Sequence, residues 1–421
     1  MSSFKSLNLN PLILEALTAK GYTKPTPIQE QSIAHILNKG DILGIAQTGT
    51  GKTAAFSLPI LTNLAAHQVK LKPYHMRCLI LTPTRELASQ IEDNIKGYGK
   101  NLNISSAVIF GGVNPRAQVS KMAKGVDIVI ATPGRLLDLM NGGHIKFDQL
   151  EIFVLDEADR MLDMGFINDV KKIITKIPQK RQTLLFSATM PKDIAELSRK
   201  LLKDPKRVEV TPESTTVEKI KQSINYVEKI NKPLLLESIL QDKSIKFALV
   251  FTRTKHGANR VVQHLERAKI AARAIHGNKS QAAREKALSE FKNGRIRVLV
   301  ATDIAARGID ISSITHVINY NLPDDPKSYV HRIGRTARAG REGVAISFCE
   351  PAEVKLLKDI EKCINYKIPV DETHPFHGVP AQIVKKENVP AEKKELAGKK
   401  PQSRSYRRKR SFSSNSSKKQ K

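Results

Sequence analysis

Three carboxylates follow a short apolar run in the stretch IFVLDEADRML, residues 152–162. The run itself, residues 152–155, is too short for a helix and contains β-branched and aromatic residues, which predicts a fully buried strand. Asp156 and Glu157 would then lie at the carboxyl end of that strand, where open α/β sheets bind ligands and a carboxylate can hold a hard cation. The alternative is a helix that begins at Asp156, because the macrodipole favours acidic residues in a first turn.

A second stretch whose residues could take part in a reaction is AQTGTGKTAAF, which follows the apolar run DILGIA and precedes a helical pattern. Its glycines allow backbone N–H groups to turn inward around phosphate oxygens, and the following helix adds its positive end. Lys52 would reach the β- and γ-phosphates, and the Thr53 hydroxyl can bind Mg²⁺. The general P-loop pattern has glycine where this chain has Ala46, a departure that a less open turn absorbs. The residues expected to contact the nucleotide here are Thr48, Gly49, Thr50, Gly51, Lys52 and Thr53.

These two stretches complement each other as halves of one nucleotide site. Asp156 would hold Mg²⁺ through water, and Glu157 is placed to orient and deprotonate the attacking water. Phosphoryl transfer also requires positive charge opposite the γ-phosphate, and arginine suits that role. Arg335 and Arg338 in HRIGRTARAGR are spaced by three, so on a helix they would share a face and could face the P-loop. By itself such a cluster is more often a solvated or nucleic-acid-facing surface.

Alternating strands and helices must position these residues. Strands are expected at DILGIA, RCLILTP, SAVIFGG, DIVIATP, IFVLDE and TLLFSAT, and again at FALVFTR, ARAIHG, RVLVATD, HVINYN and VAISF. This alternation predicts right-handed crossovers and two α/β domains, each with a parallel sheet covered by helices on both faces. The polar stretch TPESTTVEK between them predicts a linker. We therefore expect domains at 1–210 and 218–370, a linker at 211–217, and a basic, disordered tail at 371–421.

The charge of the chain indicates a polyanionic partner. The 421 residues include 70 Lys and Arg but only 41 Asp and Glu, which gives a net charge of +29. The last stretch, 399–421, contains ten Lys or Arg and no acid, and its polar composition cannot bury enough apolar surface to fold. Tyr406 and Phe412 within it slightly favour single-stranded nucleic acid, whose bases stack on aromatic rings. The alternative for this tail is a solubilising appendage.

Membrane insertion and secretion are not expected. No apolar run approaches the roughly 20 residues that a membrane helix needs, and the start MSSFKSLNLN lacks the pattern of a signal peptide. Cys78, Cys349 and Cys363 are odd in number, widely spaced and without CxxC pairs, which argues against disulfides or a zinc site. We expect buried thiols and a cytoplasmic protein.

With these motifs in place, the chain resembles the DEAD-box family of ATP-dependent RNA helicases, named for the tetrapeptide at residues 156–159. The resemblance runs from Phe4 to about residue 370 and implies two tandem RecA-like domains, ATP as substrate and Mg²⁺ as cofactor. GYTKPTPIQ, residues 21–29, is similar to the Q motif, in which Gln29 would read the adenine edge and Tyr22 would stack on its face. The alternative for these two is an ordinary helix start with a packed aromatic ring.

The resemblance also implies RNA contacts through PTRELA, GG and TPGR in the first domain, and through VFTRTKHGA, HGNKSQAAR and VATDIAARGID in the second. These stretches supply the amides, hydroxyls and arginines that bind a nucleic-acid backbone. The implied RNA-binding residues are Pro83, Thr84, Arg85, Gly111, Gly112, Thr132, Gly134, Arg135, Gly277, Arg284 and Thr302.

Further roles follow from the same resemblance. Asp310 would bind the ATP ribose, and Arg335 with Arg338 the γ-phosphate. The SAT stretch, residues 187–189, would couple the ATP state to RNA binding through hydrogen bonds to Asp159. The alternative reading is a helix N-cap, and the two roles do not exclude each other. Ala337 stands where many members have glycine, which a helix would tolerate. The implied coupling residues are Asp159, Ser187, Thr189 and His331.

The implied function is an RNA-dependent ATPase that hydrolyses ATP to ADP and phosphate and locally unwinds or remodels RNA duplexes and RNA–protein complexes. Binding through the backbone should not depend on RNA sequence. The short N-terminus, DEADRMLDMGF and the basic tail are most similar to the bacterial RhlE-type subgroup. Three alternatives remain: a DNA helicase of the same superfamily, an RNA clamp that uses ATP only to lock, and an annealing chaperone driven by the tail.

Overall fold

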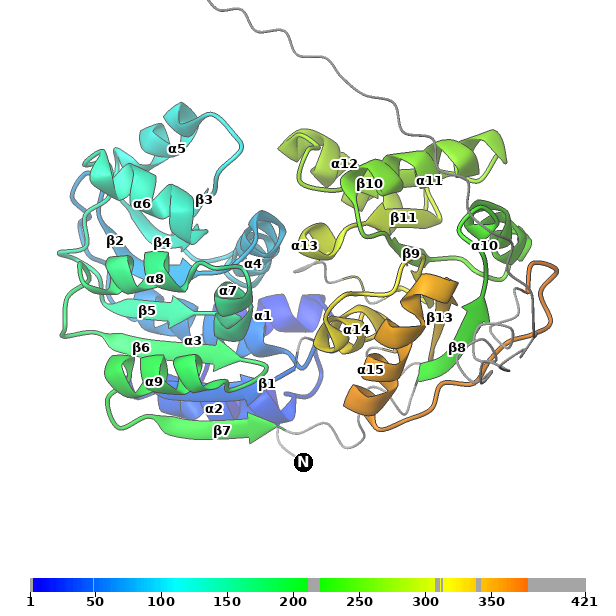
Figure 1. Ribbon diagram of the computed structural model, residues 1–421. Coiled ribbons are helices and arrows are strands. Elements are labelled where there is room, and N and C mark those ends of the chain that lie inside the picture. Colours follow the sequence, from blue (N-terminus) through cyan, green and yellow to red (C-terminus); the bar gives the residue numbers. More distant parts are fainter. Residues whose placement is uncertain are drawn as a thin grey trace, which may run out of the picture. The chain divides into compact units, whose positions relative to one another are not determined.

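The computed structural model describes residues 3–47, 49–210, 220–306, 311, 313–337 and 342–377. These residues contain two sheets, one within residues 3–210 and the other within residues 220–377 (Figure 1). We call these two parts of the chain the first lobe and the second lobe.

The first lobe contains a seven-stranded sheet in the order β3-β4-β2-β5-β6-β1-β7, and every neighbouring pair is parallel. Strands β1 and β5 are buried along their whole length, because helices cover both faces of the sheet. The strands are β1 (Ile42–Ala46), β2 (Met76–Leu81), β3 (Ser106–Ile109), β4 (Val126–Ala131), β5 (Ile152–Leu155), β6 (Gln182–Ser187) and β7 (Lys206–Val210).

Two hydrophobic clusters lie on the two faces of this sheet. Helices α1 to α4 fill one cluster with side chains such as Ile33, Phe56 and Ile91. Helices α6 to α9, with Met122 of α5, fill the other with side chains such as Met161. The helical elements are η1 (Phe4–Leu7), α1 (Pro11–Ala19), α2 (Pro27–Leu37), α3 (Lys52–Ala66), α4 (Arg85–Tyr98), α5 (Pro115–Met122), α6 (Pro133–Asn141), α7 (Ala158–Asp163), α8 (Ile167–Ile174) and α9 (Lys192–Leu201).

The second lobe contains a six-stranded parallel sheet in the order β10-β11-β9-β12-β13-β8. Helices α10 and α11 share one hydrophobic cluster with the strands, α12 packs in a second, and α14 and α15 pack in a third. The elements are β8 (Ile220–Tyr226), α10 (Lys232–Gln241), β9 (Ala248–Phe251), α11 (Lys255–Arg267), β10 (Ala272–Ile275), α12 (Gln281–Lys292), β11 (Val298–Ala301), α13 (Asp303–Ala306), β12 (His316–Asn319), α14 (Pro326–Ile333), β13 (Gly343–Cys349), η2 (Pro351–Glu353) and α15 (Val354–Ile364).

The predicted fold class is confirmed, and all eleven predicted strands are present. Strands β7 and β8 were not predicted from the sequence, and they lie at the sheet edges on either side of the predicted linker. Edge strands pair on one side only and tolerate exposed polar residues, so β7 (KRVEV) buries Val208 alone and lacks an apolar run. The linker at 211–217 lies outside the described residues.

Part of the stretch assigned to the tail belongs to the second lobe in the structure. Asn225 Nδ2 donates to Asp371 Oδ2 at 3.2 Å, and Phe376 packs against the cluster of α10 and α11. The chain beyond His377 lies outside the described residues. No helix of the described part is both long and apolar enough to cross a membrane.

The expectation of buried thiols is correct for two cysteines and wrong for the third. Cys78 and Cys349 are buried in strands, whereas Cys363 is exposed. The reason is that Cys363 lies on α15, an amphipathic helix that turns its Leu357 and Ile360 side to the core and its other side to solvent.

Candidate active site

The candidate motifs lie where parallel strands end, so each sheet gathers its own motifs at its carboxyl edge. In the first lobe, β1 leads into the P-loop (residues 46–53), β5 into Asp156, and β6 ends at Ser187 (Figure 1). Strand β6 pairs with both β5 and β1. The SAT stretch therefore emerges between the two predicted halves of the nucleotide site. In the second lobe, β11 leads into Thr302 at the corresponding edge.

The lysine of the P-loop is bonded to the backbone of the same loop. Lys52 is 6% exposed, and its Nζ donates to the Ala46 carbonyl at 2.6 Å. Gly51 caps α3 with φ 97°, and a Cβ there would lie 2.4 Å from Gln29 Nε2, so this position requires glycine. A phosphate would compete with the Ala46 carbonyl for the lysine. Thr48, predicted to contact the nucleotide, lies outside the described residues.

Gln29 joins the Q motif to the P-loop. Its Oε1 accepts from the Thr26 backbone N–H at 3.0 Å, and its Nε2 donates to the Gly51 carbonyl at 3.1 Å. The side chain is 2% exposed. The carboxamide predicted to read adenine is thus already bonded to the loop predicted to hold the phosphates. The Gln29 side chain therefore supports the shape of the P-loop.

Tyr22 is exposed but fixed in direction. Its ring is 38% exposed and packs edge-on against Phe4 and Tyr98. Its hydroxyl lies 3.2 Å from the hydroxyl of Tyr98, and burial together with this hydrogen bond raises the pKa of Tyr98. Tyr22 therefore combines a partly exposed ring with aromatic neighbours that hold its position. Sequence reasoning missed Tyr98, which lies at the far end of α4.

Asp156 has the properties of a cation ligand. It is 2% exposed, and its buried Oδ1 has no hydrogen-bond partner among the residues that the structure describes. Burial raises the pKa of Asp156 to about 7, against the opposing effect of the Lys52 charge. No group of three or more His, Cys, Asp or Glu side chains converges on a metal site in the described ranges. A lone carboxylate with a threonine hydroxyl suits Mg²⁺, which keeps several waters and uses substrate phosphates as ligands.

Glu157 has an unusual backbone conformation. Its φ of 55° and ψ of 51° place it in the left-handed region at the N-cap of α7, which costs a non-glycine residue about 1–2 kcal/mol. The side chain is buried and forms an ion pair with Arg160. Strain of this kind concentrates at functional sites, where surrounding structure holds it in place.

Asp159 and the SAT stretch form one hydrogen-bond network. The Thr189 backbone N–H and Oγ1 both donate to Asp159 Oδ2 at 2.8 Å, and the Asp159 N–H donates to Ser187 Oγ at 3.2 Å. Burial works to raise the pKa of Asp159, but the bonds from Thr189 and Ser187 hold it below its usual value. The N-cap alternative for SAT is wrong, because α9 begins at Lys192 and Pro191 caps it.

The GG loop, residues 111–113, is contacted by two arginines that are predicted to bind RNA. Arg135 donates from both terminal nitrogens to the Val113 carbonyl at 3.2 Å. A Cβ on Gly112, whose φ is 81°, would lie 2.0 Å from Arg85 Nη1, so the guanidinium of Arg85 packs directly on this glycine. These arginines therefore support the loop, and their remaining N–H donors can serve a phosphate.

The other predicted RNA residues of the first lobe lie at helix starts. Thr84 and Thr132 are the N-caps of α4 and α6, and Thr84 Oγ1 accepts from the Leu87 N–H at 3.2 Å. Pro83 is buried, so its side chain is not presented to solvent. Nothing lies within 4 Å of a Cβ added to Gly134, which leaves open space beside its backbone.

Arg284 of the second lobe is placed among other charges. Its Nη2 pairs with Glu86 Oε1 at 2.8 Å, and Arg284 itself is 9% exposed. Burial and the charge of Arg284 lower the pKa of Arg85. Glu86, which sequence reasoning missed, is the residue next to Arg85 in PTRELA. Gly277 is exposed, and Thr302 is half-buried.

A buried arginine that sequence reasoning missed fixes the second lobe's motifs. Arg332 donates from Nε and Nη2 to the two Asp303 carboxylate oxygens at 2.6 and 2.7 Å. Its Nη1 donates to the Asn321 carbonyl at 2.7 Å. This bidentate pair joins α14 to α13, and so ties HRIGR to the stretch that begins with Thr302.

The predicted helix around the arginine pair is wrong. Helix α14 ends at Ile333, and Arg335 lies in the turn that follows, 5% exposed, with its Nε donating to the His331 carbonyl at 3.2 Å. Ala337, expected on a helix, has φ 53°, the left-handed conformation that favours glycine. Gly343 is packed against this turn, since a Cβ there would lie 2.5 Å from the Thr336 side chain. Arg338 and Asp310 lie outside the described residues.

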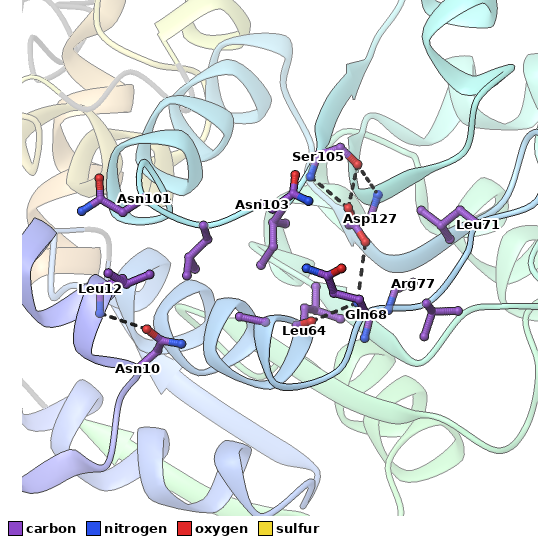
Figure 2. A pocket seen from close by; sticks show the side chains of 14 residues that line it. Asn10, Leu12, Leu64, Gln68, Leu71, Arg77, Asn101, Asn103, Ser105 and Asp127 are labelled. Carbon is purple, nitrogen blue, oxygen red and sulfur yellow. Dashed lines mark hydrogen bonds and ion pairs between the residues drawn. The ribbon is translucent and has the colours of Figure 1, made fainter.

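A separate pocket of about 360 Å³ lies at the opposite, amino edge of the first sheet (Figure 2). Arg77 lines it at the start of β2, pairing with Glu151 at 2.7 Å and Asp127 at 3.6 Å. Its guanidinium also donates to the Leu64 carbonyl at 3.0 Å. The charge of Arg77 is therefore used within the fold, and the pocket is distinct from the motifs at the carboxyl edge.

The Gly112→Ala substitution is expected to lower RNA affinity by about tenfold. The left-handed backbone costs alanine about 1–2 kcal/mol, and its Cβ would displace Arg85 from the GG loop. Fluorescence anisotropy with a labelled RNA measures the loss.

Gly97→Ala is the matched control, because this glycine lies within α4 and its added Cβ meets only the flexible end of Lys20. Wild-type affinity in the Gly112 variant would show that the packing of Arg85 on the loop does not matter for RNA binding.

Two family profiles match the chain: DEAD/DEAH box helicase over residues 26–197, and Helicase conserved C-terminal domain over residues 231–340. The DEAD-box ATP-dependent RNA helicase CshA of Bacillus cereus is 42% identical over 368 residues, which cover 87% of this chain and 69% of that protein. The ATP-dependent RNA helicase DeaD of Buchnera aphidicola is 43% identical over 367 residues, 87% of this chain and 60% of that protein. Among solved structures, S. cerevisiae Dbp5 bound to RNA and ADP BeF3 matches with a TM-score of 0.78 at 32% identity, over 92% of this chain and 99% of that chain.

Proposed function

The chain belongs to the DEAD-box family of ATP-dependent RNA helicases, and from this premise we propose how its own residues couple ATP hydrolysis to RNA remodelling. The protein is an RNA-dependent ATPase, and its two lobes are the RecA-like domains of that family. The residue assignments rest mainly on the position of three motifs in the first sheet. The P-loop, the DEAD box and the SAT stretch follow three adjacent strands, β1, β5 and β6, at one edge of one sheet.

ATP binds, in this proposal, between the Q motif and the P-loop. Tyr22 stacks on adenine, and Gln29 contacts its edge while holding the Gly51 carbonyl. Lys52 leaves the Ala46 carbonyl for the β- and γ-phosphates. Thr53 and Asp156 would hold Mg²⁺, which would supply positive charge to the phosphate oxygens. The unpartnered, buried Oδ1 of Asp156 supports this assignment.

Hydrolysis then needs a base and a counter-charge. Glu157 accepts a proton from water as the water oxygen bonds to the γ-phosphorus and the bond to the ADP oxygen breaks. Arg335 and Arg338 face the γ-phosphate and stabilise its developing charge, and Asp310 holds the ribose. The near-complete burial of Arg335 supports this role, because a buried guanidinium acts in a low-dielectric site.

RNA is bound through its backbone, without regard to base identity. The GG loop offers amides, and Arg85, Arg135 and Arg284 offer positive charge to phosphates. Such contacts predict strong salt dependence and sensitivity to 2′-hydroxyl groups.

Coupling between ATP and RNA runs through the network of Asp159, Ser187 and Thr189, with His331 as its second-lobe partner. The network joins the DEAD box directly to the strand between the two halves of the nucleotide site. ATP thus acts as a switch, and its effect on RNA binding equals its differential affinity for the two states of the protein.

Steady-state ATP hydrolysis tests this function. The full chain is assayed with no nucleic acid, with single-stranded RNA, and with DNA of identical sequence. Stimulation by RNA alone is expected. Equal stimulation by DNA would favour the DNA helicase alternative, and absence of hydrolysis in all three conditions would favour the clamp.

Deleting residues 399–421 is expected to weaken RNA affinity and to flatten its salt dependence, while RNA-saturated hydrolysis survives. The deletion removes ten Lys or Arg, and each phosphate contact on a single strand contributes about 0.7 to the slope of log K against log salt. Replacing those ten residues by Ser or Gln in the full-length chain is the matched control and should reproduce the deletion. An unchanged slope would show that the tail does not contact RNA and would favour a protein contact or a solubilising role.

Two narrower assignments concern the cellular location of the protein and its subgroup within the family. We propose a cytoplasmic location, where the free thiols of the three cysteines stay reduced. The RhlE-type subgroup stays a prediction from the stretch DEADRMLDMGF and the basic composition of residues 399–421.

A further inference from the structure

Arg160, the first residue after the DEAD tetrapeptide, contacts the carboxylate proposed as the general base. Its Nη1 forms an ion pair with Glu157 Oε2 within the first turn of α7. Both side chains are largely buried, with 13% of Arg160 and 6% of Glu157 exposed. The backbone N–H of Arg160 also donates to Asp159 Oδ1 at 3.0 Å, so the residue is anchored beside the coupling network as well.

The position of Glu157 explains why it needs such a partner. Its left-handed backbone directs the chain from β5 into α7, but the backbone alone does not set the three side-chain torsions. A buried carboxylate is stable only when a charged or hydrogen-bonding group compensates for lost water. Arg160 supplies that group through one carboxylate oxygen, and a guanidinium imposes a defined direction on the pair.

We propose that Arg160 is a positioning residue for hydrolysis. By holding Oε2, it fixes the plane of the Glu157 carboxylate and leaves Oε1 to accept the proton of the attacking water. The arginine itself exchanges no proton and contacts neither ATP nor RNA in this role. The inference rests on the proposed function of Glu157 and names the residue that makes that function geometrically possible.

The test compares RNA-saturated kcat and KM for ATP in Arg160→Ala, Arg160→Lys and the wild-type full chain. Loss of orientation at a reacting group can cost about 10²-fold, so kcat of Arg160→Ala is expected to fall by about 10- to 100-fold. The KM for ATP should change by less than about threefold. Lysine retains the charge without the planar fork, so Arg160→Lys should recover part of kcat.

A double variant separates positioning from general damage to the fold. If Arg160 acts only through Glu157, then adding Arg160→Ala to Glu157→Gln lowers kcat no further. A merely structural role would lower kcat by the same factor in both backgrounds and would overturn the proposal. Arg199→Ala is the control, because Arg199 is exposed on α9 and its Nε donates to the Ala195 carbonyl of its own helix.

Two other outcomes also decide the matter. A kcat of Arg160→Ala equal to or above that of wild type would overturn the proposal, and an increase would show that the ion pair restrains Glu157. Wild-type turnover in Glu157→Gln alone would overturn the role of Glu157 itself, and the positioning role of Arg160 with it. Intact ATP binding and thermal unfolding establish that each variant is folded.

Discussion

Glu157→Gln is expected to reduce RNA-stimulated ATP turnover by about 10²- to 10⁴-fold, the contribution typical of a general base. Glutamine keeps the size and the hydrogen-bonding shape of the side chain but cannot accept the proton from water. The residue is buried at the end of β5 with Arg160 as its ion partner, so the change removes a charge from a site that is already enclosed. Phosphate release under saturating ATP and RNA measures the loss.

Binding should survive this substitution. Lys52 and the P-loop contact the phosphates in the proposal, so nucleotide affinity measured with a fluorescent ATP analogue should stay within a fewfold of wild type. Glu196→Gln is the matched control, since it makes the same chemical change at an exposed position of α9. Turnover within about threefold of wild type in the Glu157 variant would assign the base to another residue.

Arg335→Lys is expected to lower turnover by about 10³-fold or more, as an arginine facing a γ-phosphate typically contributes 10³ to 10⁵. A lysine keeps the charge but loses the fork of donors that matches the equatorial phosphate oxygens. The side chain is 5% exposed and lies in the turn after α14, where the Arg335 backbone N–H donates to the Arg332 carbonyl at 3.0 Å. Single-turnover hydrolysis at saturating RNA measures the chemical step.

The control for this prediction is Arg267→Lys, at an exposed position near the end of α11 in the same lobe. RNA affinity and the thermal unfolding of the Arg335 variant should match wild type, which separates a catalytic loss from a disturbed turn. Turnover within tenfold of wild type would place the counter-charge elsewhere, and Arg338→Lys would then be the variant to compare.

Much of the fold follows from local sequence. Runs such as IFVL and VLVA are short, apolar and β-branched, so they predict buried parallel strands wherever helices alternate with them. The P-loop is equally local, because Gly51 has a positive φ that other residues avoid and Lys52 begins the next helix. These features depend on neighbours within a few residues, and the sequence contains those neighbours.

Elements with few local contacts were harder to predict. Strands β7 and β8 lie at sheet edges and alternate polar with apolar residues, so only pairing with β1 and β13 makes them strands. The predicted helix through Arg335 ends early at Ile333, and Ala337 adopts a left-handed turn. For the two strands a long-range contact overrides the local preference, whereas α14 ends at its C-cap Gly334.

The sequence by itself determined the strands, the P-loop, the DEAD tetrapeptide and the order of the motifs, because each is a pattern of residue types over a short stretch. Tertiary structure alone decided that β6 stands between β5 and β1, which brings Thr189 to Asp159. It also decided that Gln29 bonds to Gly51. The physical reason is that strand order and side-chain partners come from packing between residues far apart in the chain, and no short pattern specifies which distant surfaces bury each other.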